Sequence, residues 1–241
     1  MNNLQITLEE GTIQNIMVAK LWIKEGSRAD PQGLKGIHQI LSSTMCRGCG
    51  PFDNNQLAET VESCGAILRS EAYEDGLLIS LKCIKNDAYK LISLIGWMIT
   101  KPCLDPNQIQ LEKKLTLKEL KRQRENSYQQ AFDGWRQLAY KKGPYGHDPL
   151  GLISDIKNIT KEKIIPISKS LIYRKKNLVI SGSYPIDIEC YIKESNAFDK
   201  IINQNLKDKV IPFQSNTKNI LQESTENIST IYEDTQQVVI L

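Results

Sequence analysis

His38, Cys46 and Cys49 lie close together in the stretch GIHQILSSTMCRGCG, residues 36–50. Imidazole and thiolate groups bind zinc, and a Cys-x-x-Cys pair can also carry redox chemistry. A structural zinc site, however, usually needs two such pairs or a spaced histidine pair, and a redox pair stands where a strand leads into a helix. Here the two cysteines follow a predicted helix. We therefore interpret them as packed thiols, with a thiol or metal site as the alternative.

The composition bounds the class of protein. The chain has 241 residues, of which 40% are hydrophobic and 24% charged, and a net charge of +3. These values predict a globular protein large enough for one sizeable domain, without indicating a nucleic-acid or membrane partner. No apolar run reaches the roughly 18 residues of a transmembrane helix. The first residues lack the pattern of a secretory signal, so we expect a cytoplasmic protein with reduced cysteines.

Periodicity predicts the elements that must position any site. Alternating apolar and β-branched residues predict strands at 16–27, as a hairpin over 66–84, and at 176–184. Helical spacing predicts helices at 33–45, 54–65, 86–100, 105–140, 160–172 and 187–198. The region 105–140 is either one long helix or two adjoining helices, with Asp105 as its N-cap and Pro106 as its first residue. Hairpin strands beside packed helices predict an α+β fold, with a mainly antiparallel sheet packed against helices.

The C-terminal part has a different character. We assign residues 1–211 to one domain and the polar, aperiodic residues 212–233 to a linker. Residues 234–241 end in the apolar run QVVIL, which is typical of a strand. A lone strand needs a partner sheet, so we expect it to begin a missing or truncated second domain.

Several segments resemble, in the same order, the N-terminal domain of the insulinase/pitrilysin family of zinc peptidases, in the branch with mitochondrial processing peptidase. The segments are LWIKEGSRADPQGLKGI (21–37), FDNNQLAETVESCGAILRSEAYED (52–75), YGHDPLG (145–151), KNLVISGSY (176–184) and QQVVIL (236–241). The resemblance is strong over 16–195 and weak before residue 16, where the family's first hairpin looks shortened. It implies the family's layered α+β fold.

The family's zinc motif, His-x-x-Glu-His, places two histidine ligands and a glutamate base on one helix. The family pattern falls on residues 36–49, where Gly36, Leu41 and Gly48 match and Arg47 replaces a lysine. The resemblance then puts Gln39 and Ser43 at the two ligand positions and Ser42 at the position of the base. His38 lies one residue early, about 100° round the helix, and has no glutamate or histidine at the required spacing.

Two glutamates match later parts of the family's site. Glu119 follows Ser43 by 76 residues, the spacing of the third zinc ligand, and Glu112 matches a supporting glutamate. Carboxylates without imidazoles make a weak zinc site. The resemblance therefore implies a degenerate site with neither a metal nor a catalytic residue. The alternative is that both glutamates are ordinary solvated residues of a helix.

The family also binds the substrate backbone along a strand that carries Asn-Ala-x-Thr. The corresponding residues here are Arg69, Ser70, Glu71 and Ala72, so a peptide-binding strand would have different polar anchors.

These departures predict a catalytically inactive family member that needs no cofactor of its own, whereas its active relatives use zinc. We expect it to act as the zinc-less subunit or peptide-binding half of a heteromeric peptidase, beside a zinc-bearing homologous subunit. One alternative is an active metallopeptidase subunit that uses Glu112, Glu119 and His147. The other is a thiol- or metal-binding protein that acts through Cys46 and Cys49.

Overall fold

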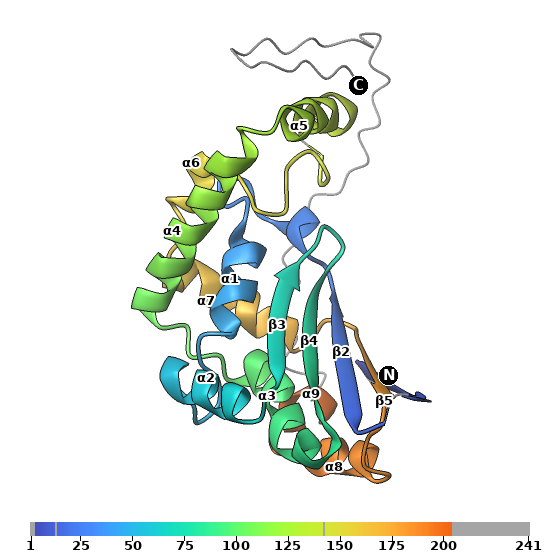
Figure 1. Cartoon of the computed structure of the whole chain (residues 1–241). Coiled ribbons are helices and arrows are strands. Elements are labelled where there is room, and N and C mark those ends of the chain that lie inside the picture. The colour runs from blue at the N-terminus through green and yellow to red at the C-terminus, as the bar shows by residue number, and fades with distance from the viewer. Residues whose placement is uncertain (1–2, 13, 142, 204–241) are drawn as a thin grey trace.

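The structure, a computed structural model, describes residues 3–12, 14–141 and 143–203 (Figure 1). Its sheet has five strands in the order β1-β5-β2-β4-β3. The strands are β1 (Leu4–Glu10), β2 (Ile16–Lys24), β3 (Ile67–Ala72), β4 (Gly76–Ile84) and β5 (Lys176–Gly182). All neighbours are antiparallel except β1 and β5, which are parallel. The α+β fold with a mainly antiparallel sheet is confirmed, and β1 and β3 are its edges.

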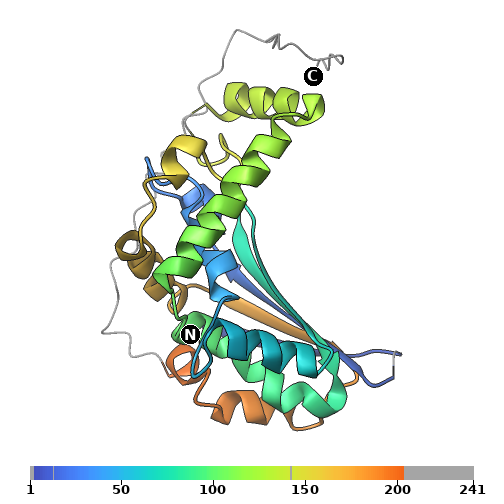
Figure 2. The same cartoon turned by 60° about the vertical axis from the view of Figure 1, so that its left-hand side comes forward.

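Helices gather on one face of this sheet (Figure 2). The longer ones are α1 (Ile37–Met45), α2 (Asn54–Ser63), α3 (Ala88–Thr100), α4 (Pro106–Gln123), α5 (Ser127–Tyr140) and α7 (Lys161–Leu171). The shorter ones are α6 (Ile153–Ile156), α8 (Ile188–Glu194), α9 (Asp199–Ile202) and the 3-10 turns η1 (Ser27–Ala29) and η2 (Lys85–Asp87). Helix α1 lies between β3 on one side and α4 on the other. This places the two helices of the candidate site face to face.

Alternation along the strands separates the core from the other face of the sheet. In β2, Met17, Leu21 and Ile23 are fully buried under the helices, whereas Lys20 on the opposite face is exposed. Strand β4 repeats this pattern in register with β2. Helix α3, which is apolar on most of its surface, is covered by the sheet, α7 and α8. Burial of this continuous apolar surface provides the main driving force for the fold.

Local capping signals fix several helix ends as the sequence predicts. Asp105 accepts hydrogen bonds from the amides of Asn107 (2.8 Å) and Gln108 (3.1 Å), and Pro106 is the first residue of α4. The region 105–140 forms two helices, because Asn126 caps a new one. Pro166 lies inside α7 without ending it.

Other boundaries differ from the prediction. The predicted helix 33–45 begins only at Ile37, because Gly36 has φ of 97° and precedes the helix in a left-handed conformation. The predicted strand 16–27 ends at Lys24, since Glu25 has φ of 70° and residues 27–29 form η1. Strand β1 was not predicted. The proposed linker 212–233 and terminal strand 234–241 lie outside the described residues.

Within the described ranges, no helix combines the length and the apolar character that crossing a bilayer requires.

Candidate functional site

Two of the three motif positions on α1, Ser42 and Ser43, carry short hydroxyl side chains that already have bonding partners. The Ser42 hydroxyl is buried and lies 2.7 Å from the Ser70 hydroxyl on β3. The Ser43 hydroxyl donates to the backbone carbonyl oxygens of Gln39 (3.0 Å) and Ile40 (3.3 Å) one turn back. Ser42 thus connects the helix to the edge strand, and Ser43 bonds within the helix.

Glu112 on α4 is bound by an arginine. Both Nε and NH2 of Arg47, just after α1, lie 2.7 Å from Oε1 of Glu112. The Glu112 side chain is 8% exposed. A buried carboxylate with this charge-assisted pairing has its charge compensated without a metal ion. Glu112 is therefore not an ordinary solvated residue.

Glu119 lies further along α4 and is also bound by an arginine. Arg122 donates from Nε to Oε2 (2.9 Å) and from NH2 to Oε1 (2.6 Å), a two-pronged contact at i and i+3. The hydrogen bonds from Arg122 lower the pKa of Glu119. The Glu119 side chain is more exposed than that of Glu112, so its pairing is of the weaker surface kind.

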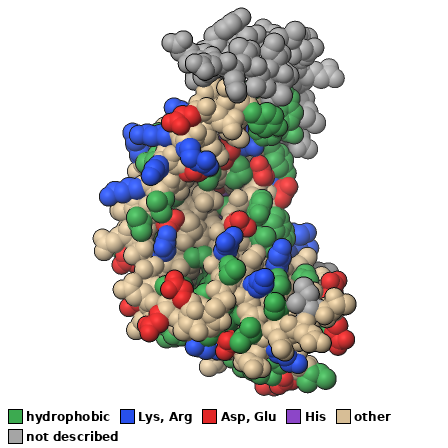
Figure 3. Space-filling view, in the orientation of Figure 1, with side chains coloured by type: hydrophobic (Ala, Val, Ile, Leu, Met, Phe, Trp, Pro, Cys, Tyr) green, Lys and Arg blue, Asp and Glu red, His purple; other side chains and the backbone are tan. Residues whose placement is uncertain are grey.

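A cleft of about 620 Å³ brings part of this set together. Gln39, Glu112, Glu119 and Arg122 all line it. Ser42 and Ser43 do not, because their hydroxyls are bonded elsewhere. Basic and acidic side chains are both visible along the side of the molecule where α4 lies (Figure 3). The lining of the cleft carries three cations and three carboxylates.

These residues do not fit a zinc ion. Zinc in proteins takes imidazole, thiolate or carboxylate ligands. This cleft offers one amide and three carboxylates, of which Glu112 and Glu119 are each bound by arginine. In the described part of the chain, no three His, Cys, Asp or Glu side chains form a group that could hold a metal ion. No metal-assisted step can be derived from this arrangement.

The candidate peptide strand, residues 69–72, lies in β3 at the edge of the sheet. Arg69 and Glu71 are exposed, while Ser70 and Ala72 face α1 and are half-buried. Only β4 pairs with β3 among the described strands. Its other edge can therefore accept an added strand.

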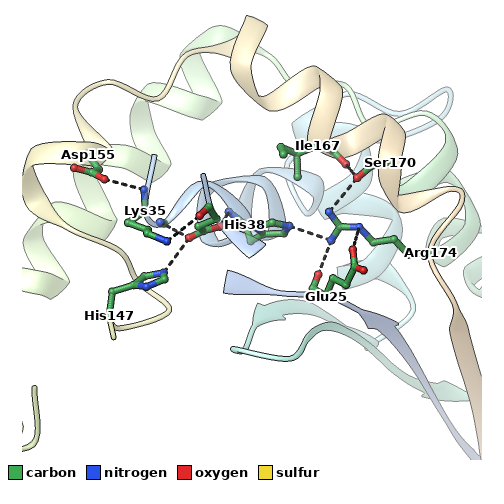
Figure 4. Close-up of polar contacts among 10 residues, drawn as sticks. Glu25, Lys35, His38, His147, Asp155, Ile167, Ser170 and Arg174 are labelled. Atoms are coloured by element: carbon green, nitrogen blue, oxygen red, sulfur yellow. Dashed lines mark hydrogen bonds and ion pairs between the residues drawn. The ribbon is translucent and has the colours of Figure 1, made fainter. Parts of the chain in front are cut away.

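His38 does not reach this cleft but belongs to a buried network at the start of α1 (Figure 4). Asp30 accepts hydrogen bonds from the backbone amides of Gly36 (2.6 Å) and His38 (3.3 Å) and lies 2.5 Å from Nδ1 of His38. It thereby satisfies N–H groups that the first turn of a helix leaves free. Asp30 is thus the cap of the helix that carries the motif positions.

The other side of the His38 ring faces Arg174. Its NH1 lies 3.0 Å from Nε2 of His38, and Arg174 also donates to Ser170 and to the Glu25 carbonyl oxygen. Burial lowers the pKa of His38 and lowers that of Arg174 to about 10. Burial alone would raise the pKa of Asp30, but hydrogen bonds from His147 and His38 outweigh it and lower that pKa. The network holds a neutral imidazole between an aspartate and an arginine.

His147 also belongs to this network, with Nε2 3.5 Å from Oδ2 of Asp30. It does not line the cleft that contains Glu112 and Glu119. The structure therefore does not bring together the three residues of the alternative peptidase hypothesis.

Cys46 and Cys49 lie in the packed region after α1. Cys49 is fully buried, and its Sγ lies 3.8 Å from the Leu94 carbonyl oxygen. Burial raises the pKa of Cys49 to about 12 and that of Cys46 to about 11. Both thiols are protonated at neutral pH, whereas redox and metal sites need thiolates.

The sequence predicted where the site residues lie, but it did not predict which side chains bind them. Arg122 could have been found, because Glu and Arg at i and i+3 share a helix face. Arg47 stands at a position where the resemblance expects lysine, but no local pattern indicates that it contacts Glu112, 65 residues away. Nothing in the sequence linked Asp30 or Arg174 to His38.

The chain matches the sequence profile described as Insulinase (Peptidase family M16) over residues 6–151. It is 26% identical over 168 residues to mitochondrial-processing peptidase subunit alpha-2 of Dictyostelium discoideum, covering 67% of this chain and 36% of the relative. It is 22% identical over 198 residues to mitochondrial-processing peptidase subunit beta of Saccharomyces cerevisiae, covering 82% of this chain and 42% of the relative.

Among solved structures, the peptidase M16 inactive domain from Pseudomonas fluorescens has the same fold. The TM-score is 0.67 at 19% identity, over 77% of this chain and 46% of that one. The chain thus spans less than half the length of these relatives. The matched profile covers β2 to β4, α1 to α5 and every residue that lines the cleft, and the chain belongs to the insulinase family of peptidases, family M16.

Proposed function

We propose that this chain is a non-catalytic M16 subunit that holds an extended peptide along β3, beside a homologous subunit that carries zinc. The observation that carries the proposal is the state of the motif positions. Gln39, Ser42 and Ser43 offer no imidazole and no base. Of the two remaining carboxylates, Glu112 is buried against Arg47 at 2.7 Å and Glu119 is bound by Arg122 at 2.6 Å. Such a cleft can bind a chain without hydrolysing it.

The relatives support a paired arrangement. Both mitochondrial-processing peptidase matches are named as subunits, alpha-2 and beta. The Pseudomonas fluorescens structure is described as an inactive domain of the same family. A member that lacks the catalytic groups fits the role of one component in a larger assembly.

The register of β3 supports a peptide site at the edge of the sheet. The Tyr73 amide donates to the Gly76 carbonyl oxygen at 2.8 Å, so hydrogen-bonded pairs recur at every second residue of the β3–β4 ladder. The Ala72 amide falls between these pairs and points to the open edge. A peptide added there would pair with backbone groups and need few specific side chains.

Catalysis and peptide binding are tested separately, and two measurements test catalysis. Metal analysis of the purified chain should find no stoichiometric zinc, and a fluorogenic peptide should not be cleaved. Stoichiometric zinc together with hydrolysis that a chelator abolishes would overturn the non-catalytic role.

Binding is measured by fluorescence anisotropy of a labelled (Thr-Val-Lys)3 peptide. Ala72→Pro removes the outward amide without removing a bond to β4, and edge strands tolerate such a proline. We expect this variant to weaken binding about tenfold or more, and the control Ala72→Ser, which keeps the amide, to bind like wild type. Equal binding by both variants would exclude β3 as the peptide site.

The partner is tested by co-expression with a zinc-bearing M16 subunit from the source cell. A stable complex on size-exclusion chromatography, with peptidase activity above that of the zinc-bearing subunit alone, is expected. Two separate peaks and unchanged activity would contradict the partner role.

A further inference from the structure

A second pocket, of about 400 Å³, lies between α4, α5 and the loop that leads into α6. It shares no lining residue with the cleft at the motif positions. Its lining is strongly polar and includes Arg124, Gln130, Asp133, Arg136, His147 and Asp148. The volume falls within the range of small-molecule sites.

Arg136 is the unusual residue in this pocket. It is 9% exposed, and no described residue accepts a hydrogen bond from its buried NH1. The nearest carboxylate oxygens lie 3.6 Å away on Glu74 and 3.9 Å away on Asp148, beyond hydrogen-bond length. Its guanidinium lies over the Phe132 ring, 5.0 Å from the centroid. A buried guanidinium with unbonded donors is costly unless something else accepts from it.

Two carboxylates in the same pocket, Asp133 and Asp148, could accept further hydrogen bonds from a cation. Asp148 accepts from the Leu150 amide (2.7 Å) and from Gln129 (3.4 Å). Among the described residues, Asp133 accepts a hydrogen bond only from the same Gln129 Nε2, at 3.1 Å. Burial and the nearby charge of Asp148 raise the pKa of Asp133, and the charge of Arg136 and the Gln129 hydrogen bond offset this only in part. A cation placed between the two carboxylates would relieve this repulsion.

We propose that this pocket binds a free α-amino acid, with its carboxylate on Arg136 and its ammonium group between Asp133 and Asp148. The guanidinium fork matches a carboxylate in shape and charge. An anion without an amine would meet the repulsion of the two aspartates, and an amine without a carboxylate would meet that of Arg136. A compact zwitterion satisfies both, and its binding does not depend on the proposed role in peptide binding.

Isothermal titration calorimetry with alanine as the probe tests the site, with acetate and methylamine as single-charge comparators. We expect alanine to bind, and both comparators to bind at least tenfold more weakly. Arg136→Gln should weaken alanine binding at least tenfold. Lys101→Gln, which makes the same charge change at an exposed position outside the pocket, should leave it unchanged.

Gly134→Leu provides a second variant in case loss of Arg136 disturbs the fold. Gly134 lines the pocket from within α5, so leucine fills space there, keeps every charge and favours the helix. Alanine binding should be lost with an unchanged circular dichroism spectrum. Equal affinity for acetate and alanine, binding that survives both variants, or no binding of alanine to the wild-type protein at tens of millimolar would each overturn the proposal.

Discussion

Arg47 binds Glu112 across 65 residues of sequence, with two guanidinium nitrogens each 2.7 Å from the same carboxylate oxygen. The contact joins the segment after α1 to the middle of α4. These are the two elements on which the resemblance places a zinc site. A cation of the chain itself therefore compensates a carboxylate that the resemblance places beside the zinc site.

Removing Arg47 should destabilise the protein. In Arg47→Gln, Glu112 would stay buried without its cation, and we expect a loss of about 2–3 kcal/mol in the free energy of unfolding. Urea denaturation followed by circular dichroism measures it. Arg122→Gln is the matched control, because Arg122 is 74% exposed and its pair should contribute at most about 1 kcal/mol. Equal losses in the two variants would show that burial of Glu112 has no energetic consequence.

Restoring the motif should create a zinc site that Arg122 weakens. The triple variant Gln39→His, Ser42→Glu and Ser43→His supplies both imidazoles, but Glu119 is still bound by Arg122. Adding Arg122→Ala should tighten zinc binding about 10- to 100-fold, the usual effect of changing groups around a ligand. Competition with a zinc-binding dye measures the affinity.

The control for this comparison is Lys114→Ala in the triple variant. Lys114 is exposed on α4 and does not line the cleft. The restoration hypothesis fails if the triple variant binds zinc as tightly with Arg122 as without it.

Stability should rise with pH above neutrality because of Lys176. This side chain is 1% exposed, and burial followed by the charge of Arg174 lowers its pKa to about 7 from 10.5. Between these values the unfolded chain holds a proton that the folded protein has lost. The free energy of unfolding should therefore increase by up to about 1.4 kcal/mol per pH unit from this residue, and be flat below pH 7.

The difference between wild type and Lys176→Met in urea denaturation at several pH values isolates this effect. The exposed neighbour Lys175 gives the control, since Lys175→Met should leave the slope unchanged. A wild-type curve parallel to that of Lys176→Met across this pH range would contradict the lowered pKa.

Asp30 should matter more than an ordinary helix cap. Asp30→Ala removes two bonds to the start of α1 and the partner of His38, so we expect a loss of about 2–4 kcal/mol. Asp53→Ala removes the exposed cap of α2 and should cost about 1 kcal/mol. Thermal unfolding of both variants makes the comparison. Similar losses would show that the buried network adds nothing to capping.

Local patterns were enough to predict most of the fold. The apolar alternation of β2 and β4 and the cap Asp105 are properties of neighbouring residues. Strand β1 was missed because its pairing with β5 depends on residues more than 170 positions away. The start of α1 was placed too early, since the left-handed conformation of Gly36 is supported by Asp30 through a side-chain contact.

The positions of the site residues could be predicted from their spacing along α1 and α4. Their burial and their ion-pair partners could not. Whether Glu112 is solvated or buried depends on how α4 packs against α1, and its partner Arg47 comes from another segment. The same holds for Arg136, whose position in α5 says nothing of the carboxylates of Glu74 and Asp148. Contacts between side chains of distant segments produce no periodic pattern in the sequence, so they cannot be predicted from it.

The strand order has a consequence for synthesis of the chain. Strand β5 lies between β1 and β2, which precede it by more than 150 residues. Until Gly182 has left the ribosome, the emerging chain holds a sheet with an open gap, and the strands on both sides expose unpaired edges. Such edges are sites for wrong pairing and aggregation. Among the described strands, β5 is the last to be made and closes the sheet from within, so a chain that stops before it cannot complete the core.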